Sequence, residues 1–317
     1  MNRRSLTTIS TLLRRELWES PVAFMWTPLG IALLILAFVV FSLILGGRFD
    51  AEMAYTSDML RMLAEQPDQQ RRVVVSGMLF WISAIFFQLM LLIILFYLAG
   101  SLFDDRKDRS ILFWKSLPVS DGMTVASKLL AACLLVPAMF FLAIALTHLV
   151  LLLIATGYSL VAGVNPWTTI WVPATLPRLW SVMLLGLLVQ AIWLLPVYAW
   201  LLFCSSWAPR LPLLIAIAIP AGLALTQHAW TLITRFGLPE FNIGLIMLKR
   251  LGSGTLPMSA NVQFDGGFDS IEFSDELFMS FSTTLGHLAK LETWVGVAIA
   301  MALLWGAVWF RRRATDG

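Results

Sequence analysis

The sequence predicts an all-α membrane protein with six transmembrane helices, and its composition and long apolar runs are the observations that predict it. Of the 317 residues, 59% are hydrophobic and only 13% are charged, with a mean hydropathy of +0.82. Soluble domains carry about twice that share of charge. The two cysteines, Cys133 and Cys204, both lie in apolar runs, so no disulfide framework is expected.

The apolar runs define the expected spans. Each run is about 20 residues or longer, which is the length that a helix needs to cross hydrocarbon. We expect spans near residues 24–45, 78–100, 129–156, 179–204, 211–233 and 293–310. The first run has no small-residue cleavage site nearby, so we interpret it as a retained span and not as a signal peptide. Residues 24–310 then form one transmembrane domain of six spans.

The placement of basic residues predicts the topology. Of the 22 Lys and Arg residues, 13 fall in the N-terminal segment, the loop 101–128, Arg210 and the tail 311–317. The other nine fall in longer loops rich in Asp and Glu, which contribute little to orientation. We therefore expect both termini and the loop 101–128 to be cytoplasmic. Because the basic residues lie beside apolar segments and the net charge is only +3, we expect no nucleic-acid partner.

Residues 1–23 are expected to form a cytoplasmic amphipathic interface helix ahead of the first span. An apolar stripe at helical spacing is formed by Leu6, Ile9, Leu13 and Leu17. Arg14, Glu16 and Glu19 fall outside that stripe, and Pro21 ends the pattern. Such a helix lies along a membrane surface. An ordinary polar N-terminus is the alternative.

The segment Phe103–Asp121, FDDRKDRSILFWKSLPVSD, is the most highly charged part of the loop between the second and third spans. Its acidic start suits the positive N-terminal end of a short helix, which Pro118 would stop. Apolar bulk that a merely solvated loop would not need is supplied by Ile111, Leu112, Phe113 and Trp114. Two interpretations stay open: the helix docks into a groove on another subunit, or it lies on lipid headgroups.

The two loops on the opposite, periplasmic side are residues 46–77 and 234–292. The first is expected to be partly helical around Thr56–Glu65. The second is acidic and has a Gly-rich turn at Asp265–Gly267. The two loops form either a small external cap that gates the spans or simple solvated connectors.

No catalytic motif survives inspection, so we expect that the chain is not an enzyme. The stretch Gly122–Leu129 lacks the second Gly and the Ser or Thr of a phosphate-binding loop. No HExxH pair for zinc and no G-x-S-x-G nucleophile elbow occurs. The run Asp265–Glu276 only partly matches a calcium loop, so no metal is expected.

Polar residues inside the spans are costly in hydrocarbon and therefore informative. The clear cases are Gln88, His148, Gln190, Gln227 and His228. One interpretation is that they line a translocation path, and the other is that they join neighbouring helices. No span carries a charged residue near its centre, which argues against a proton- or sodium-coupled carrier.

Taken together, these features resemble the membrane subunit of a bacterial ATP-binding-cassette exporter of the type 2 permease family. In that family the loop between spans two and three carries an acidic–Arg pair, then Gly-Ser/Thr, then an apolar run ending in Pro. Asp105–Arg106 resemble the acidic–Arg pair, Ser110 resembles the Ser/Thr, and Leu117–Pro118 resemble the end of the apolar run. Arg109 stands where Gly is common. Ser127–Leu130, SKLL, is similar to the usual lead into span three.

The resemblance implies that Asp104–Trp114 is a coupling helix that docks on a separate ATPase subunit. The implied contact residues are Asp104, Asp105, Arg106, Arg109, Ile111, Phe113 and Trp114. ATP and Mg²⁺ would be bound by that partner, so no cofactor is expected on this chain. The resemblance also implies a bacterial inner-membrane location and assembly with a second copy or a sister permease. A membrane scaffold or regulatory subunit without transport is the alternative function.

Overall fold

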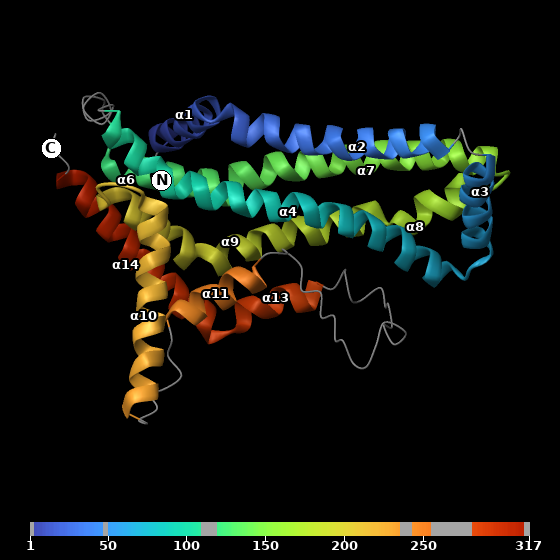
Figure 1. The fold of residues 1–317 in the computed structure, drawn as a ribbon. Helices are drawn as coiled ribbons and strands as arrows, with labels where there is room; N and C mark the ends of the chain where they lie inside the picture. Colours follow the sequence, from blue (N-terminus) through green and yellow to red (C-terminus); the bar gives the residue numbers. More distant parts are fainter. Residues whose placement is uncertain (1–2, 47–49, 109–118, 235–242, 255–280, 314–317) are drawn as a thin grey trace.

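The computed structural model describes residues 3–46, 50–108, 119–234, 243–254 and 281–313, and every element in these ranges is a helix (Figure 1). The α-helices are α1 (Arg3–Glu19), α2 (Thr27–Gly46), α3 (Asp50–Glu65), α4 (Asp68–Lys107), α6 (Asp121–Leu130), α7 (Val136–Val161), α8 (Val172–Ala174), α9 (Leu176–Trp207), α10 (Pro212–Thr234), α11 (Ile243–Ser253), α13 (Phe281–Ala289) and α14 (Leu291–Arg313). The predicted all-α fold class is confirmed.

Six helical stretches are long and apolar enough to cross a membrane, and each overlaps one predicted span. They are Val22–Ser42, Asp68–Lys107, Asp121–Val161, Trp167–Trp207, Pro212–Trp230 and Leu291–Arg313. The second stretch is a single 40-residue helix. At 1.5 Å per residue it is roughly 60 Å long, about twice the thickness of hydrocarbon. Both of its ends therefore reach beyond the apolar layer.

The core lies between the long helices of the second, third and fourth stretches. In the most apolar part of these three stretches, 44%, 39% and 61% of the residues are buried. In the stretches that begin at Val22, Pro212 and Leu291, the buried shares are 17%, 11% and 22%. Large side chains with no more than 1% exposure fill the space between them, including Phe80, Phe87, Met90, Ile94, Phe140, Ile144, Leu179, Leu194 and Leu202. Of the other three spans, α2 and α14 pack against this centre, whereas most of α10 points away from the bundle (Figure 1).

Three π-helical turns interrupt the helices, and each ends two residues before a proline. They are Val22–Trp26 (η1) before Pro28, Ala131–Leu135 (η2) before Pro137, and Trp167–Trp171 (η3) before Pro173. A proline has no N–H, and its ring clashes with the carbonyl four residues back. The wider turn relieves that clash: after η1, for example, the Thr27 N–H donates to the carbonyl of Val22, five residues earlier.

The two ends of the bundle differ. At one end, which we call the loop end, α1, α6 and the C-terminal ends of α4 and α14 come together (Figure 1). At the far end, α3 crosses the bundle, and its Arg61 Nε donates to the Ala162 carbonyl at 3.1 Å. The helix expected around Thr56–Glu65 is confirmed as part of α3. The candidate calcium loop lies outside the described residues.

Candidate functional site: a buried ion-pair cluster at the loop end

Charged side chains from four helices come together at the loop end. We call this group the ionic junction, and it consists of Arg15 and Glu16 of α1, Asp105 of α4, Asp121 and Lys128 of α6, and Arg311 of α14. Burial is extreme for such residues: Glu16 is 1%, Lys128 2%, Arg311 3% and Asp105 7% exposed. Charged side chains are almost never buried this deeply unless they are paired.

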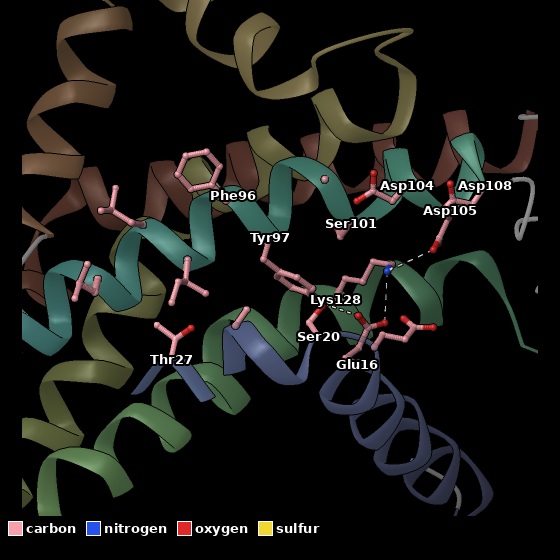
Figure 2. Close-up of a pocket in the computed structure, with 16 residues that line it drawn as sticks. Glu16, Ser20, Thr27, Phe96, Tyr97, Ser101, Asp104, Asp105, Asp108 and Lys128 are labelled. Atoms are coloured by element: carbon pink, nitrogen blue, oxygen red, sulfur yellow. Dashed lines mark hydrogen bonds and ion pairs between the residues drawn. The ribbon is translucent and has the colours of Figure 1, made fainter. Parts of the chain in front are cut away.

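Asp105 is the centre of the junction. Its Oδ2 accepts a hydrogen bond from Arg311 Nη1 at 2.9 Å, and its Oδ1 lies 3.7 Å from Lys128 Nζ and 3.9 Å from Arg15 Nη2. Figure 2 shows Lys128 between the carboxylates of Asp105 and Glu16. Lys128 Nζ is 3.5 Å from Glu16 Oε1, and the Tyr97 hydroxyl donates to Glu16 Oε2 at 2.6 Å. Three cations thus surround a single buried carboxylate.

Local sequence puts these groups in reach of one another. Tyr97 and Asp105 lie two helical turns apart on one face of α4, and Asp121 and Lys128 are similarly spaced on α6. Ser120 begins α6, since its backbone is extended and its Oγ accepts from the Met123 N–H at 3.3 Å. Arg311 Nε reaches Asp121 at 3.2 Å, so the C-terminal helix holds both ends of the loop 109–118.

Arg106 has a separate partner within the chain. Its Nη2 donates to the carbonyls of Ser205 and Ala208 at 2.8 and 2.9 Å. These carbonyls belong to the C-terminal end of α9, where helical acceptors have no partner of their own. Arg106 therefore joins the end of α4 to the end of α9.

The structure corrects two sequence predictions about this end. Asp104 and Asp105 do not begin a short helix, because they lie in the last turns of α4. Glu16 does not lie on the outer polar face of α1, because it is buried against Lys128 and Tyr97. For Asp105 and Glu16, tertiary ion pairs outweigh the local pattern. Among the implied contact residues, Arg109, Ile111, Phe113 and Trp114 lie outside the described residues, and Asp104 is exposed.

His148 joins the three central helices. Its Nδ1 accepts from Trp180 Nε1 of α9 at 3.2 Å, so Nε2 carries the proton of the neutral ring. Nε2 lies 3.0 Å from both Ser83 Oγ and the Leu79 carbonyl of α4. The side chain is fully buried and fully bonded. These contacts favour helix joining as its role.

Gln190 belongs to a second polar cluster, which we call the arginine junction. Its members are Gln190 and Trp193 of α9, Arg250 and Ser253 of α11, Gly254, and Glu292 and Gly296 of α14. Gln190 Nε2 donates to the Gly254 carbonyl at 2.5 Å. Arg250 donates to the carbonyls of Trp193, at 2.8 Å, and Glu292, and lies over the Trp193 ring at 4.5 Å. Burial lowers the pKa of Arg250, which still remains a cation.

The remaining predicted path residues lie elsewhere. Gln88 is exposed on α4, and Gln227 and His228 are half-buried and exposed on α10. His148 and Gln190 therefore make separate sets of contacts. A translocation role for them stays a prediction.

Sequence analysis missed Glu16, Lys128 and Arg311 as members of one site. The available signal was the position of Lys128 and Arg311, since each of these two lies at the edge of an apolar run, where a charge is costly. A position of this kind predicts pairing but does not say which residues pair.

Comparison of the chain with protein-family models, with curated proteins and with solved structures gives no match.

Proposed function

We propose that this chain is the membrane permease subunit of an ATP-driven transporter of the type 2 exporter kind, coupled to a separate ATPase through the loop between α4 and α6. The observation that carries the proposal is the ionic junction beside that loop. Asp105 precedes the loop and Asp121 follows it, and both pair with Arg311. A permease needs such a connection, because a movement imposed on the loop must reach the spans.

The junction distributes a displacement of the loop to several helices at once. Asp105 lies on α4, Lys128 on the helix that continues into α7, and Glu16 on the helix that continues into α2. Arg106 adds α9. ATP binding to the partner would thus favour one of two arrangements of four spans, as coupling between two sites requires.

In this proposal both termini and the loop end face the cytoplasm of a bacterial inner membrane, where ATP is available. The basic tail beginning at Arg311 and the basic residues of α1 agree with that orientation. Six spans supply one half of a path, so we propose a dimer of permease chains, with itself or a sister chain, carrying two ATPase subunits.

The test is the ATPase activity of a candidate partner ATPase, measured in liposomes with and without the chain. We expect the chain to change the rate of ATP hydrolysis. We expect Phe113→Ala combined with Trp114→Ala to abolish that change while the complex still folds, because these residues are the predicted apolar wedge. Asp121→Asn should weaken it, since Arg311 then holds the loop on one side only.

Glu65→Gln is the matched control, because it neutralises an exposed carboxylate at the far end. It should leave the ATPase response unchanged. If the chain binds no ATPase and has no effect on hydrolysis, the permease proposal is wrong, and a scaffold or regulatory subunit becomes the better interpretation.

A further inference from the structure

A pocket of about 710 Å³ lies beside the ionic junction, between α4 and the segment that joins α1 to α2 (Figure 2). Its lining changes in character along α4. Asp108, Asp104 and Ser101 line one end, and Phe96, Leu92 and Leu89 line the other. From Leu89 to Asp108 the helix rises roughly 28 Å, the length of an extended amphiphile.

Among the described lining residues, the polar end carries more negative than positive charge. Five carboxylates and one ammonium line the pocket. Glu16 and Asp105 are neutralised within the ionic junction, and Glu19 pairs with Arg15 at 2.6 Å. Asp104 and Asp108 are different, because neither carboxylate has a hydrogen-bond or ion-pair partner among the described residues. They lie one helical turn apart and present two acceptors to whatever enters the pocket.

A third observation concerns a carboxylate of the ionic junction. Glu16 also lines the pocket, and its Oε1 accepts no hydrogen bond although the side chain is 1% exposed. The Lys128 ammonium, 3.5 Å away, is the cation that faces this oxygen. A buried carboxylate oxygen in this state has unused acceptor capacity. Glu16 therefore adds a carboxylate oxygen that accepts no hydrogen bond to the pocket lining.

The apolar end is open to the surroundings of the bundle. Leu92 is 49% and Phe96 62% exposed, on a helix that is otherwise central to the core. Trp18 and Trp26, which flank the lining residues Glu19 and Thr27, are also strongly exposed, as is typical of side chains at a membrane interface. In a membrane, this arrangement would place the carboxylates at headgroup level and the apolar end in hydrocarbon.

We propose that this pocket binds an amphipathic organic cation, with its ammonium group at Asp104 and Asp108 and its apolar chain along Leu92 and Phe96. A metal ion fits less well, since the described residues contain no group of three His, Cys, Asp or Glu side chains placed to hold one. An ammonium on an apolar chain matches both ends of the pocket. The identification of this ligand as the transported cargo rests on the proposed permease function. The binding of the ligand to the pocket does not rest on that function.

The test uses the whole chain, without any ATPase, in nanodiscs of phosphatidylcholine. The probes are three diphenylhexatriene dyes of one shape, carrying a trimethylammonium group, no charge, or a carboxylate. Binding is read from energy transfer between tryptophan and dye. We expect saturable binding of the cationic dye only, and the other two dyes should partition as they do into empty nanodiscs.

Asp104→Asn combined with Asp108→Asn should weaken binding of the cationic dye by about tenfold, because two partly exposed ion pairs are lost. Glu65→Gln should leave binding unchanged, and the unfolding temperatures of both variants should match that of the wild type. Equal affinity in wild type and the double variant, or equal binding of the three dyes, would overturn the proposal.

Replacing part of the phosphatidylcholine with phosphatidylethanolamine identifies the source of the cation. Competition by the ethanolamine headgroup would assign the pocket to a lipid amine, and unchanged dye affinity would assign it to a free amphipathic amine. Because no ATPase is present, failure of the ATPase test and failure of this test are separate results.

Discussion

The ionic junction and the arginine junction both hold helices together with buried cations, but they do so by different means. In the ionic junction three cations share one carboxylate, and the contacts of Lys128 are 3.5 and 3.7 Å long. In the arginine junction one guanidinium donates to two backbone carbonyls and stacks on Trp193. The first depends on charge, and the second depends on shape and hydrogen-bond geometry.

This difference determines how each junction responds to movement. Coulomb attraction falls slowly with distance, so a contact of 3.5–3.9 Å persists when helices shift by a fraction of an ångström. Hydrogen bonds weaken steeply once distance and angle depart from their optimum. We therefore expect the loop end to move as a connected group and the arginine junction to stay rigid.

The largest effect should come from removing the shared carboxylate. Asp105→Asn leaves Lys128 and Arg311 buried without their common counter-charge, and breaking a buried pair in this way costs about 3–5 kcal/mol. The measurement is the unfolding temperature in detergent. Asp68→Asn is the control, because the Asp68 side chain is 75% exposed and its pair with Arg71 contributes about 0–1 kcal/mol. Equal losses in the two variants would contradict the central place of Asp105.

A smaller effect is expected from crowding the arginine junction. A Cβ added at Gly296 would lie 2.7 Å from Arg250 Nη1 and Nη2, so Gly296→Ala must displace a guanidinium that is held on several sides. Overpacking of this kind costs about 1–3 kcal/mol. Gly286→Ala is the matched control, since an added Cβ there meets nothing within 4 Å. Hydrogen exchange of α11 should rise in the first variant and not in the second.

The smallest effect should be a pH dependence at α13. Burial lowers the pKa of His287 below its ordinary value, and the nearby Lys290 ammonium lowers it further. The folded chain thus prefers the neutral ring, which lies 5.4 Å from Trp193. At a pH above the ordinary pKa of His, the ring is neutral in both the folded and the unfolded chain. As the pH falls, the unfolded chain binds a proton before the folded chain does, so the folded state loses stability.

We expect hydrogen exchange of α13 to rise between about pH 7.5 and about pH 5, and His287→Gln to remove that rise. Exchange that rises equally in the variant would show that His287 is not the titrating group.

The spans could be predicted from sequence because the requirement for about 20 apolar residues is local and strong. Helix α1 was predicted for the same kind of reason, from a periodic apolar stripe. The orientation of Glu16 could not be predicted, because its partner Lys128 is 112 positions away along the chain and only the packed bundle brings them together. The pocket also depends on packing and left no sequence pattern.

The same reason explains why Arg106 was assigned only an external role. Its fit to a family motif said nothing about the free carbonyls at the end of α9, which it reaches across about 100 residues of sequence. Residues flanking an apolar run are thus better candidates for internal pairing than their charge alone suggests.

The proline-linked π turns have a mechanical consequence. Helices bend where the regular hydrogen-bond ladder is interrupted, at prolines and π turns. η1 lies between α1 and α2, and η2 lies between α6 and α7, so α1 and α6, two of the four helices that carry the ionic junction, each meet a span at a hinge. Since Glu16 and Lys128 tie α1 to α6, the two helices would tilt together while the spans below them remain straight.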